Sequence, residues 1–324
     1  MLTCASSLSK WIERVEPMQF PRPYRNEEDL QRMLDLLVEG RRAATGTYYV
    51  HTGDLKWWLY YPSEARDWRE AIFLWDQPDG GLLGWVYFSL KFRTFDLFVQ
   101  PELRGSPEHE GMLGWSEEHL AGLVRAQAGQ EIRTMWVLEN DLATTGLLER
   151  RGFVRAEDFM DHFQRSLDDP LPVPALPTGF AVRPVAGEHE VPPRAAASHA
   201  AFASRWPFDA YCQRYLGFMR SPAYVPEHDL VVVAPDGRFA AFCIVWPDPL
   251  NRVGLFEPVG THPDFQRLGL GKAVMAEGLR RLQAQGMRSA IVGAEHDNPA
   301  AHRLYQSLGF QISNRICSYA KRIS

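Results

Sequence analysis

The feature that most restricts how this chain folds is an internal repeat on either side of a proline-rich segment. Residues 168–177 hold four prolines in ten positions, which precludes a helix or a central strand and favours an extended linker. Pro23 and Pro101 lie 78 positions apart before this segment, and Pro184 and Pro263 lie 79 apart after it. Each side then closes with a leucine-rich stretch that ends in Gly-Phe, at positions 152–153 and 309–310. The sequence therefore predicts two copies of one fold.

We place the first copy at residues 1–167, the linker at 168–177 and the second copy at residues 178–324. Residues 1–176 carry 19 Lys and Arg against 28 Asp and Glu, whereas residues 177–324 carry 16 against 12. An acidic half beside a weakly basic one is not typical of nucleic-acid binding, which needs a clustered positive field. This distribution of charge suits an anionic cofactor bound to the second copy.

We expect a cytoplasmic protein that holds no metal. No apolar run approaches the length of a membrane span, and residues 1–18 lack the apolar core of a secretory signal. The four cysteines, Cys4, Cys212, Cys243 and Cys317, are scattered and form no C-x-x-C pair. This spacing favours reduced thiols over a disulfide framework or a zinc site.

Hydrophobic periodicity and turn residues predict a mixed α/β fold for the second copy. We expect strands at residues 180–184, 230–234, 239–246, 253–261, 289–294 and 311–321. We expect helices at residues 191–202, 206–220, 272–285 and 299–308. A Pro-Asp-Gly turn at 235–237 joins the second and third strands as a hairpin.

Residues 264–273, between the strand at 253–261 and the next helix, have the chemistry of a pyrophosphate site; we call them the glycine loop. Gly269 and Gly271 let the backbone curl so that N–H groups converge, and the helix adds the positive end of its dipole. Arg267 and Lys272 add charge. A tight turn without a ligand is the alternative for these residues alone.

Two better-known phosphate motifs do not fit the glycine loop. A P-loop requires a glycine where Gln266 stands and Ser or Thr where Ala273 stands. A dinucleotide fingerprint requires a third glycine at the position of Val274.

Three separated motifs together resemble the GNAT superfamily of N-acetyltransferases, which bind acetyl-CoA. The motifs are Glu257-Pro258-Val259-Gly260-Thr261-His262-Pro263, Gln266-x-x-Gly269-x-Gly271, and Asn298-x-x-Ala301-x-x-Leu304-Tyr305-x-x-x-Gly309-Phe310. The predicted order of elements is also that of the family. The resemblance implies a mixed α/β chain of two tandem GNAT domains.

The resemblance also implies how acetyl-CoA is held. In the family the fourth strand binds the pantetheine arm through its backbone, and a bulge frees an N–H for the thioester oxygen. Asn298 would contact the pantetheine amides, although simple helix capping explains it equally well. The cofactor-binding residues implied in this way are Val259, Gly260, Thr261, Gln266, Arg267, Leu268, Gly269, Leu270, Gly271, Lys272, Ala273, Asn298 and Ala301.

Tyr305 and Glu257 are the catalytic residues that the resemblance implies. Tyr305 matches the family tyrosine that protonates the departing CoA sulfur, and an amphipathic packing tyrosine is the alternative. Glu257, placed upstream of the bulge, would deprotonate the acceptor amine directly or through water, unless it is a surface residue. His262, Asp264 and His296 are weaker candidates for this base.

The first copy departs from the family at these points. Its loop, residues 104–111, contains Pro107, Glu108 and Glu110, which remove an N–H and bring the wrong charge for phosphate. Aligning the Gly-Phe pairs puts Leu148 opposite Tyr305 and Asp141 opposite Asn298. We therefore expect a degenerate, structural first copy, one acetyl-CoA per chain, and a monomer that resembles a fused homodimer.

The resemblance implies an N-acetyltransferase that acts on a primary amine of a small molecule or peptide. A non-catalytic acyl-CoA sensor is the alternative, but it would need neither Tyr305 nor Glu257. Fem-type aminoacyl transferases also pair two GNAT folds, yet they do not need a CoA loop. Aromatic residues lie where the family builds its acceptor wall: Trp206, Phe208, Tyr211, Tyr215, Phe218 and Tyr224.

Overall fold

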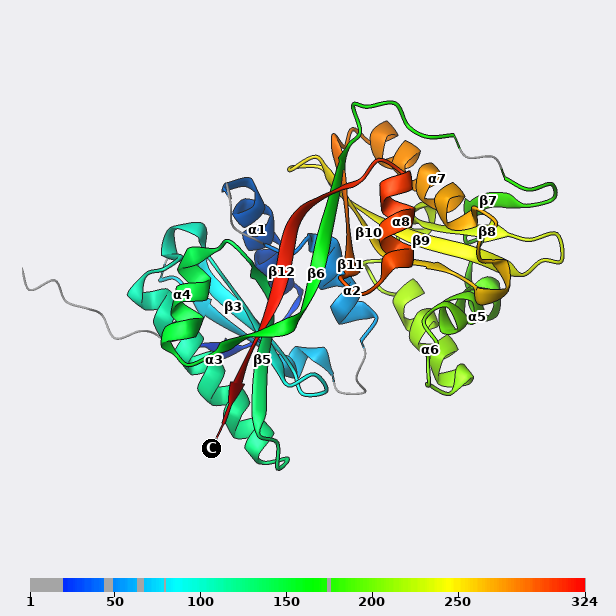
Figure 1. Ribbon diagram of the computed structural model, residues 1–324. Coiled ribbons are helices and arrows are strands. Elements are labelled where there is room, and N and C mark those ends of the chain that lie inside the picture. The colour runs from blue at the N-terminus through cyan, green and yellow to red at the C-terminus, as the bar shows by residue number, and fades with distance from the viewer. Residues whose placement is uncertain (1–19, 44–48, 63–66, 79, 174–175, 324) are drawn as a thin grey trace, which may run out of the picture.

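The computed structural model describes residues 20–43, 49–62, 67–78, 80–173 and 176–323. The predictions for residues 1–18, including Cys4, lie outside these ranges. Within them, 12 strands form one mixed sheet in the order β1-β2-β3-β4-β5-β12-β6-β11-β10-β9-β8-β7 (Figure 1). No helix in the described residues is long and apolar enough to span a membrane.

The first copy contributes the strands β1 (Arg22–Pro23), β2 (Ile72–Asp76), β3 (Leu82–Ser89), β4 (Thr94–Val99), β5 (Glu131–Leu138) and β6 (Val154–Ser166). Its α-helices are α1 (Glu27–Ala43), α2 (Thr52–Tyr60), α3 (Pro107–Arg125) and α4 (Leu142–Arg150).

The second copy contributes β7 (Ala181–Pro184), β8 (Asp229–Val233), β9 (Phe239–Asp248), β10 (Val253–Thr261), β11 (Ser289–Glu295) and β12 (Gln311–Arg322). Its α-helices are α5 (Val191–Ala201), α6 (Phe208–Met219), α7 (Leu270–Ala284) and α8 (Pro299–Ser307). The elements predicted from periodicity are confirmed with small differences at their ends. The helix expected from residue 272 begins at Leu270, so the last residues of the glycine loop form the first turn of α7.

Helices cover both faces of the strands in the second copy. On one face α7 and α8 bury apolar side chains against β9, β10 and β11, with Phe256, Val274 and Leu279 fully buried. On the other face α5 and α6 pack against the same strands through a second, aromatic-rich cluster. Because both faces are buried, β9 is apolar along nearly its whole length.

The last strands of the two copies are exchanged. β6 of the first copy pairs with β11 of the second, and β12 of the second pairs with β5 of the first. β6 and β12 also pair with each other, and they run side by side through the middle of the molecule (Figure 1). The repeat predicted these strands but not this exchange, which makes one sheet of both copies.

The repeat extends to individual hydrogen bonds. In β1, Arg22 donates to both carboxylate oxygens of Asp29 at 2.7 Å; in β7, Arg183 donates to both oxygens of Glu190. The acid follows the arginine by seven residues each time, and the backbone N–H three residues after the arginine donates to the same carboxylate. We call each of these pairs an arginine clamp.

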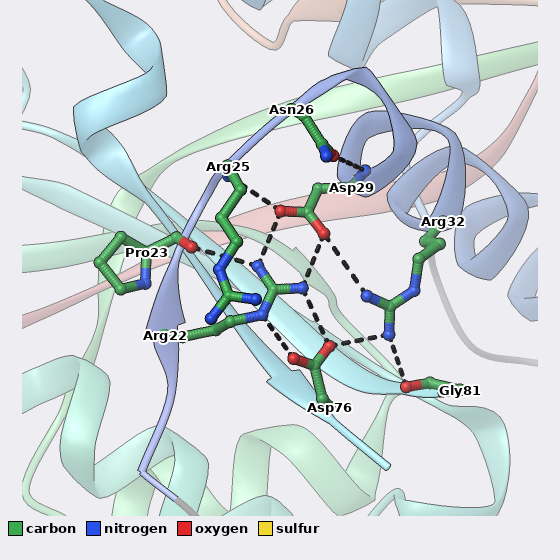
Figure 2. A network of polar contacts seen from close by, with 8 residues as sticks. All are labelled: Arg22, Pro23, Arg25, Asn26, Asp29, Arg32, Asp76 and Gly81. Atoms are coloured by element: carbon green, nitrogen blue, oxygen red, sulfur yellow. Dashed lines mark hydrogen bonds and ion pairs between the residues drawn. The ribbon is translucent and has the colours of Figure 1, made fainter. Parts of the chain in front are cut away.

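The arginine clamp of the first copy belongs to a larger network. Figure 2 shows Arg22 and Arg32 side by side, each paired with both Asp29 of α1 and Asp76 of β2. Arg32 donates to Asp76 at 2.7 Å and to the carbonyl oxygen of Gly81 at 2.6 Å. The network therefore fixes the edge strand β1 to both α1 and β2.

Candidate active site

The parallel strands β10 and β11 separate partway along their length. They pair only from Val253 with Ser289 to Leu255 with Ile291, although β10 continues to Thr261 and β11 to Glu295. Over the same stretch β10 remains paired with β9, so its edge toward β11 is left for another partner. We call this opening the β10–β11 gap.

A bulge in β10 lies where the strands separate. The register against β9 shifts between Phe256 and Val259, and the Glu257–Pro258 peptide bond is cis. The bulge expected from the family resemblance is therefore present, but Glu257 lies within it and not upstream of it. Because Pro258 has no N–H, Val259 is the first residue after Glu257 whose backbone can donate a hydrogen bond.

The glycine loop forms an exposed N-terminus for α7. Gly269 is the N-cap, in the left-handed region at φ 77°, and the first intrahelical bond of α7 runs from the Ala273 N–H to its carbonyl oxygen. The N–H groups of Leu270, Gly271 and Lys272 precede that bond and have no intrahelical acceptor. They therefore point where an anion can accept from them.

Side chains of the glycine loop leave this N-terminus open and positive. Gln266, Arg267, Leu268 and Gly269 are exposed and Lys272 is half-buried. In the part of the chain that the structure describes, neither Arg267 nor Lys272 forms an ion pair with a carboxylate. Both charges are available to a ligand.

Two glycines near the gap are required by packing. A Cβ at Gly271 would lie 2.9 Å from Thr261 Oγ1, and one at Gly260 would lie 2.3 Å from the ring of Phe242. Substituting Gly271 would thus disturb the contact between α7 and β10 as well as any ligand.

The helix α8 begins after Asn298 and carries Tyr305, which belongs to the same apolar cluster as Phe256 of β10 and Val292 of β11. The Asn298 side chain caps α8 by accepting from the N–H of Ala301 at 3.1 Å, so the capping role is real. Tyr305 is 6% exposed, and its ring packs edge-on against Phe163 at 5.4 Å. Its hydroxyl makes no hydrogen bond within the described residues. Burial and the nearby Glu257 carboxylate raise the pKa of Tyr305, which therefore remains protonated at neutral pH.

Glu257 is the best-placed base among the predicted candidates. Burial, with a further contribution from Asp54, raises the pKa of its carboxyl to about 8. The other three candidates have local roles. His262 accepts from the Asp264 N–H at 3.2 Å, Asp264 pairs with Arg238, and His296 stacks on Phe159 at 4.2 Å.

Known proteins resemble this chain in both sequence and fold. Residues 196–310 match the model of the acetyltransferase (GNAT) family. A mycothiol acetyltransferase of Frankia casuarinae is 28% identical over 265 residues, which cover 75% of this chain and 72% of that protein. A mycothiol acetyltransferase of Kineococcus radiotolerans is 31% identical over 208 residues, or 62% of this chain and 66% of that protein.

The chain belongs to the GNAT acetyltransferase family. Solved structures agree with the predicted mixed α/β GNAT fold. The tandem GNAT protein from the clavulanic acid biosynthesis pathway superposes with a TM-score of 0.68 at 18% identity, covering 93% of this chain and 97% of its own. A GCN5-related N-acetyltransferase from Sphaerobacter thermophilus gives 0.62 at 19% identity, covering 93% and 94%.

Beside Glu257, this GNAT protein has a pocket of about 350 Å³ between its two copies, which we call the aromatic pocket. The second copy provides three of the six aromatic residues predicted for the acceptor wall, namely Trp206, Tyr211 and Tyr215. Phe218 and Tyr224 pack behind them, and Phe208 is 42% exposed. Among the described residues, the pocket is lined by Trp57, Tyr61, Lys91, Arg194, Ser198, Phe202, Ser204, Trp206, Tyr211, Arg214, Tyr215, Glu257 and Pro258.

The first copy therefore helps to form the pocket, beyond the structural role expected for it. Its helix α2 brings Trp57 to the pocket by packing on β9 and β10, where Gly53 approaches Trp246 so closely that a Cβ would lie 2.4 Å from the indole. His51, ahead of α2, lies 3.3 Å from the carbonyl oxygen of Val253. Periodicity gave no signal for these residues, because the contact joins positions about 200 apart.

The equivalent gap in the first copy is closed. β4 and β5 pair only at Thr94 and Arg133, but the space beyond is about 30 Å³. Arg104 turns inward to an ion pair with Asp141 and donates to Thr144 at 3.0 Å. Leu148, opposite Tyr305, is 1% exposed.

The loop of the first copy uses its own hydrogen-bond donors. The Gly105 N–H donates to the His109 ring, and the His109 N–H donates to Ser106, the N-cap of α3. Pro107 has no N–H to offer. The described residues hold no group of three or more His, Cys, Asp or Glu side chains that could bind a metal.

Proposed function

We propose that this GNAT acetyltransferase transfers the acetyl group of acetyl-CoA to a primary amine of a small molecule or peptide. The observation that carries the proposal is the β10–β11 gap, with an open, positive glycine loop at one end and Glu257 and Tyr305 at the other. The pyrophosphate would lie on residues 266–273, and the pantetheine arm along Val259, Gly260 and Thr261. Asn298 has an amide nitrogen left to donate to the arm.

We propose direct attack of the amine on the thioester. The neutral amine nitrogen of the acceptor bonds to the carbonyl carbon, and the Glu257 carboxylate takes the proton that this nitrogen loses, directly or through water. The Val259 N–H stabilises the negative charge that develops on the carbonyl oxygen. The carbon–sulfur bond breaks, and the Tyr305 hydroxyl gives its proton to the sulfur. The products are an amide and CoA, and solvent exchange restores both side chains.

The two copies have unequal roles in this proposal. Residues 178–324 would form the catalytic domain, and residues 1–167 a degenerate one that binds no cofactor but lines the acceptor pocket. We expect the chain to act as a monomer, because the exchanged strands already join the two copies as partners.

Titration calorimetry and a CoA-release assay test this function. We expect one acetyl-CoA per chain, and CoA release that depends on an amine. The amine panel should include the acceptor of mycothiol acetyltransferases, because relatives carry that name. Tight binding without release by any amine would instead support an acyl-CoA sensor. A stoichiometry of two would refute the unequal roles.

A further inference from the structure

The Glu257 carbonyl oxygen lies where β10 has lost its regular strand partners. Both β9 and β10 are described along their whole length, and in their register neither Glu257 nor Pro258 has a partner on β9. On the other edge of β10, the pairing with β11 ends at Leu255. A carbonyl group that the sheet does not satisfy needs a hydrogen-bond donor from elsewhere.

A tryptophan of β9 provides this donor. The Trp246 indole N–H donates to the Glu257 carbonyl oxygen at 2.7 Å. Trp246 pairs with Leu255 in the register of the two strands, so its side chain reaches two residues along β10 to the bulge. It is 6% exposed, and the centre of its ring lies 6.0 Å from that of Phe218. The indole therefore holds the bulge from within the apolar cluster that α5 and α6 form with the sheet.

The first copy contacts this indole through α2. Gly53, in the first turn of α2, lies so close to Trp246 that an added Cβ would be 2.4 Å from the indole. Glycine is a poor helix former, and this close approach explains its presence in α2. The Gly53 N–H donates to the His51 ring at 2.9 Å, and the other ring nitrogen of His51 lies 3.3 Å from the Val253 carbonyl oxygen. The N-terminus of α2 is thus attached both to the start of β10 and, through Trp246, to its bulge.

A fixed carbonyl group at Glu257 also fixes the direction of the Glu257 side chain. Pairing with β9 holds the backbone as far as Phe256, and the bond from Trp246 holds the next carbonyl group. The Cα–Cβ bond of Glu257 lies between these two fixed points, and its side chain lines the aromatic pocket. Val259, whose N–H is the proposed donor to the thioester oxygen, follows two residues later.

We infer that Trp246 is a positioning residue for acetyl transfer, and that the first copy holds it in place through Gly53. The inference rests on the proposed function, in which Glu257 is the base, and gives the first copy a part in aligning that base. Trp246 contacts neither the acceptor nor the thioester in this scheme. It acts through the backbone of the bulge, which orients the Glu257 carboxylate and the Val259 N–H.

Trp246→Phe tests the hydrogen bond, because it keeps an aromatic ring and removes the N–H. We expect kcat to fall at least about tenfold, with little change in the KM for acetyl-CoA, because a misplacement of about 1 Å can cost on the order of 100-fold in rate. Trp85→Phe is the matched control. Trp85 is fully buried in the first copy, and its indole N–H has no hydrogen-bond partner among the described residues. A Trp246→Phe variant with the same kcat as Trp85→Phe would overturn the inference.

An isosteric residue separates the hydrogen bond from the volume of the ring. Benzothienylalanine at position 246 exchanges the N–H for sulfur and preserves the two fused rings. We expect it to lower kcat nearly as much as Trp246→Phe does. A kcat equal to that of the wild type would contradict the proposal, because Trp246 would then only fill space.

Gly53→Ala tests the contribution of the first copy. The added methyl would displace Trp246, so we expect a several-fold fall in kcat and little further loss when Gly53→Ala is combined with Trp246→Phe. Gly122→Ala is the matched control, because Gly122 lies in α3 of the first copy and a Cβ there would meet no atom within 4 Å. Melting curves and acetyl-CoA calorimetry confirm that each variant is folded. Fully additive losses in the double variant would refute the link through Gly53.

Crystal structures provide a readout that needs no turnover. The Glu257 side chain should occupy one position in the wild type and a displaced one in Trp246→Phe. An unmoved Glu257 side chain would overturn the inference. An absence of CoA release by the wild-type protein with every amine would count only against the proposed function.

Discussion

The β10–β11 gap and its counterpart between β4 and β5 share one backbone plan but differ in a few side chains. In the second copy, Gly269 provides no side-chain cap for the N-terminus of α7, and Arg267 is exposed. In the first copy, Ser106 caps α3 and Arg104 is committed to Asp141. The comparison teaches that the opening between diverging strands closes when its own donors and charges are satisfied internally, without any change of fold.

The largest expected effect comes from reversing the charge of the open loop. Arg267→Glu with Lys272→Glu should weaken acetyl-CoA binding at least about a hundredfold, because each contact to a charged group contributes roughly 1.5–3 kcal/mol. Arg267 is exposed, Lys272 is half-buried, and neither forms an ion pair with a described carboxylate, so the melting temperature should change little. Glu108→Lys, the matched change in the loop of the first copy, should leave the affinity for acetyl-CoA measured by calorimetry unchanged. An unchanged affinity in the double variant would place the cofactor elsewhere.

The next comparison sets Tyr305 against Leu148. Tyr305→Phe should lower kcat roughly ten- to a thousandfold, the range of general acid–base catalysis, with little change in cofactor affinity. Leu148→Met, which preserves volume at the equivalent position of the first copy, should leave kcat unchanged. A Tyr305→Phe variant with full kcat across the pH range would make Tyr305 a packing residue.

The raised pKa of Glu257 predicts two opposite trends with pH. Only the carboxylate is a base, so kcat/KM should fall as the pH drops below about 8, and Glu257→Gln should remove this acidic limb. The folded protein favours the protonated form, so this residue's contribution to stability should decrease as the pH rises from 4.5 to about 8. Melting curves should show that Glu257→Gln raises the melting temperature relative to wild type by more at pH 9 than at pH 5. Persistence of the limb in the variant would direct attention to His262 or Asp264.

The smallest effects concern the two arginine clamps. Arg22→Gln should reduce the free energy of unfolding by about 2 kcal/mol, because Arg22 is 17% exposed and joins two carboxylates. Arg183→Gln should cost under about 1 kcal/mol, since Arg183 is 37% exposed and has one carboxylate partner. Urea unfolding measures both changes, and a larger loss for Arg183 would contradict the structural comparison.

Much of the fold could be predicted because its signals are local. Alternating apolar residues, a Pro-Asp-Gly turn and an Asn before a helix each act within a few residues, and the elements of the second copy follow from them. The glycine loop was visible for the same reason, since its residues adjoin a strand and a helix. Glu257, inside the bulge, was found by resemblance and not by periodicity.

The aromatic pocket could be identified only from the folded chain. Trp57 and Arg214 lie far apart in the sequence and line one pocket only because α2 of the first copy packs on the second. Arg194, a lone arginine in an alanine-rich helix, is a sequence signal for a buried polar site, but its partner Asp229 is 35 residues away. Side chains that meet only across a domain contact produce no periodic pattern in the sequence.

By itself, the sequence determined the repeat, the mixed α/β elements, the open loop of the second copy and the loss of that loop in the first. Each depends on residue type at neighbouring positions, where backbone sterics and hydrogen-bond donors act directly. Only the tertiary structure decided that β6 and β12 change places and that the first copy lines the aromatic pocket. Strand pairing is specified by complementary edges and buried faces, and two copies of one fold offer nearly the same edges. The choice between them therefore depends on the packing of the whole chain.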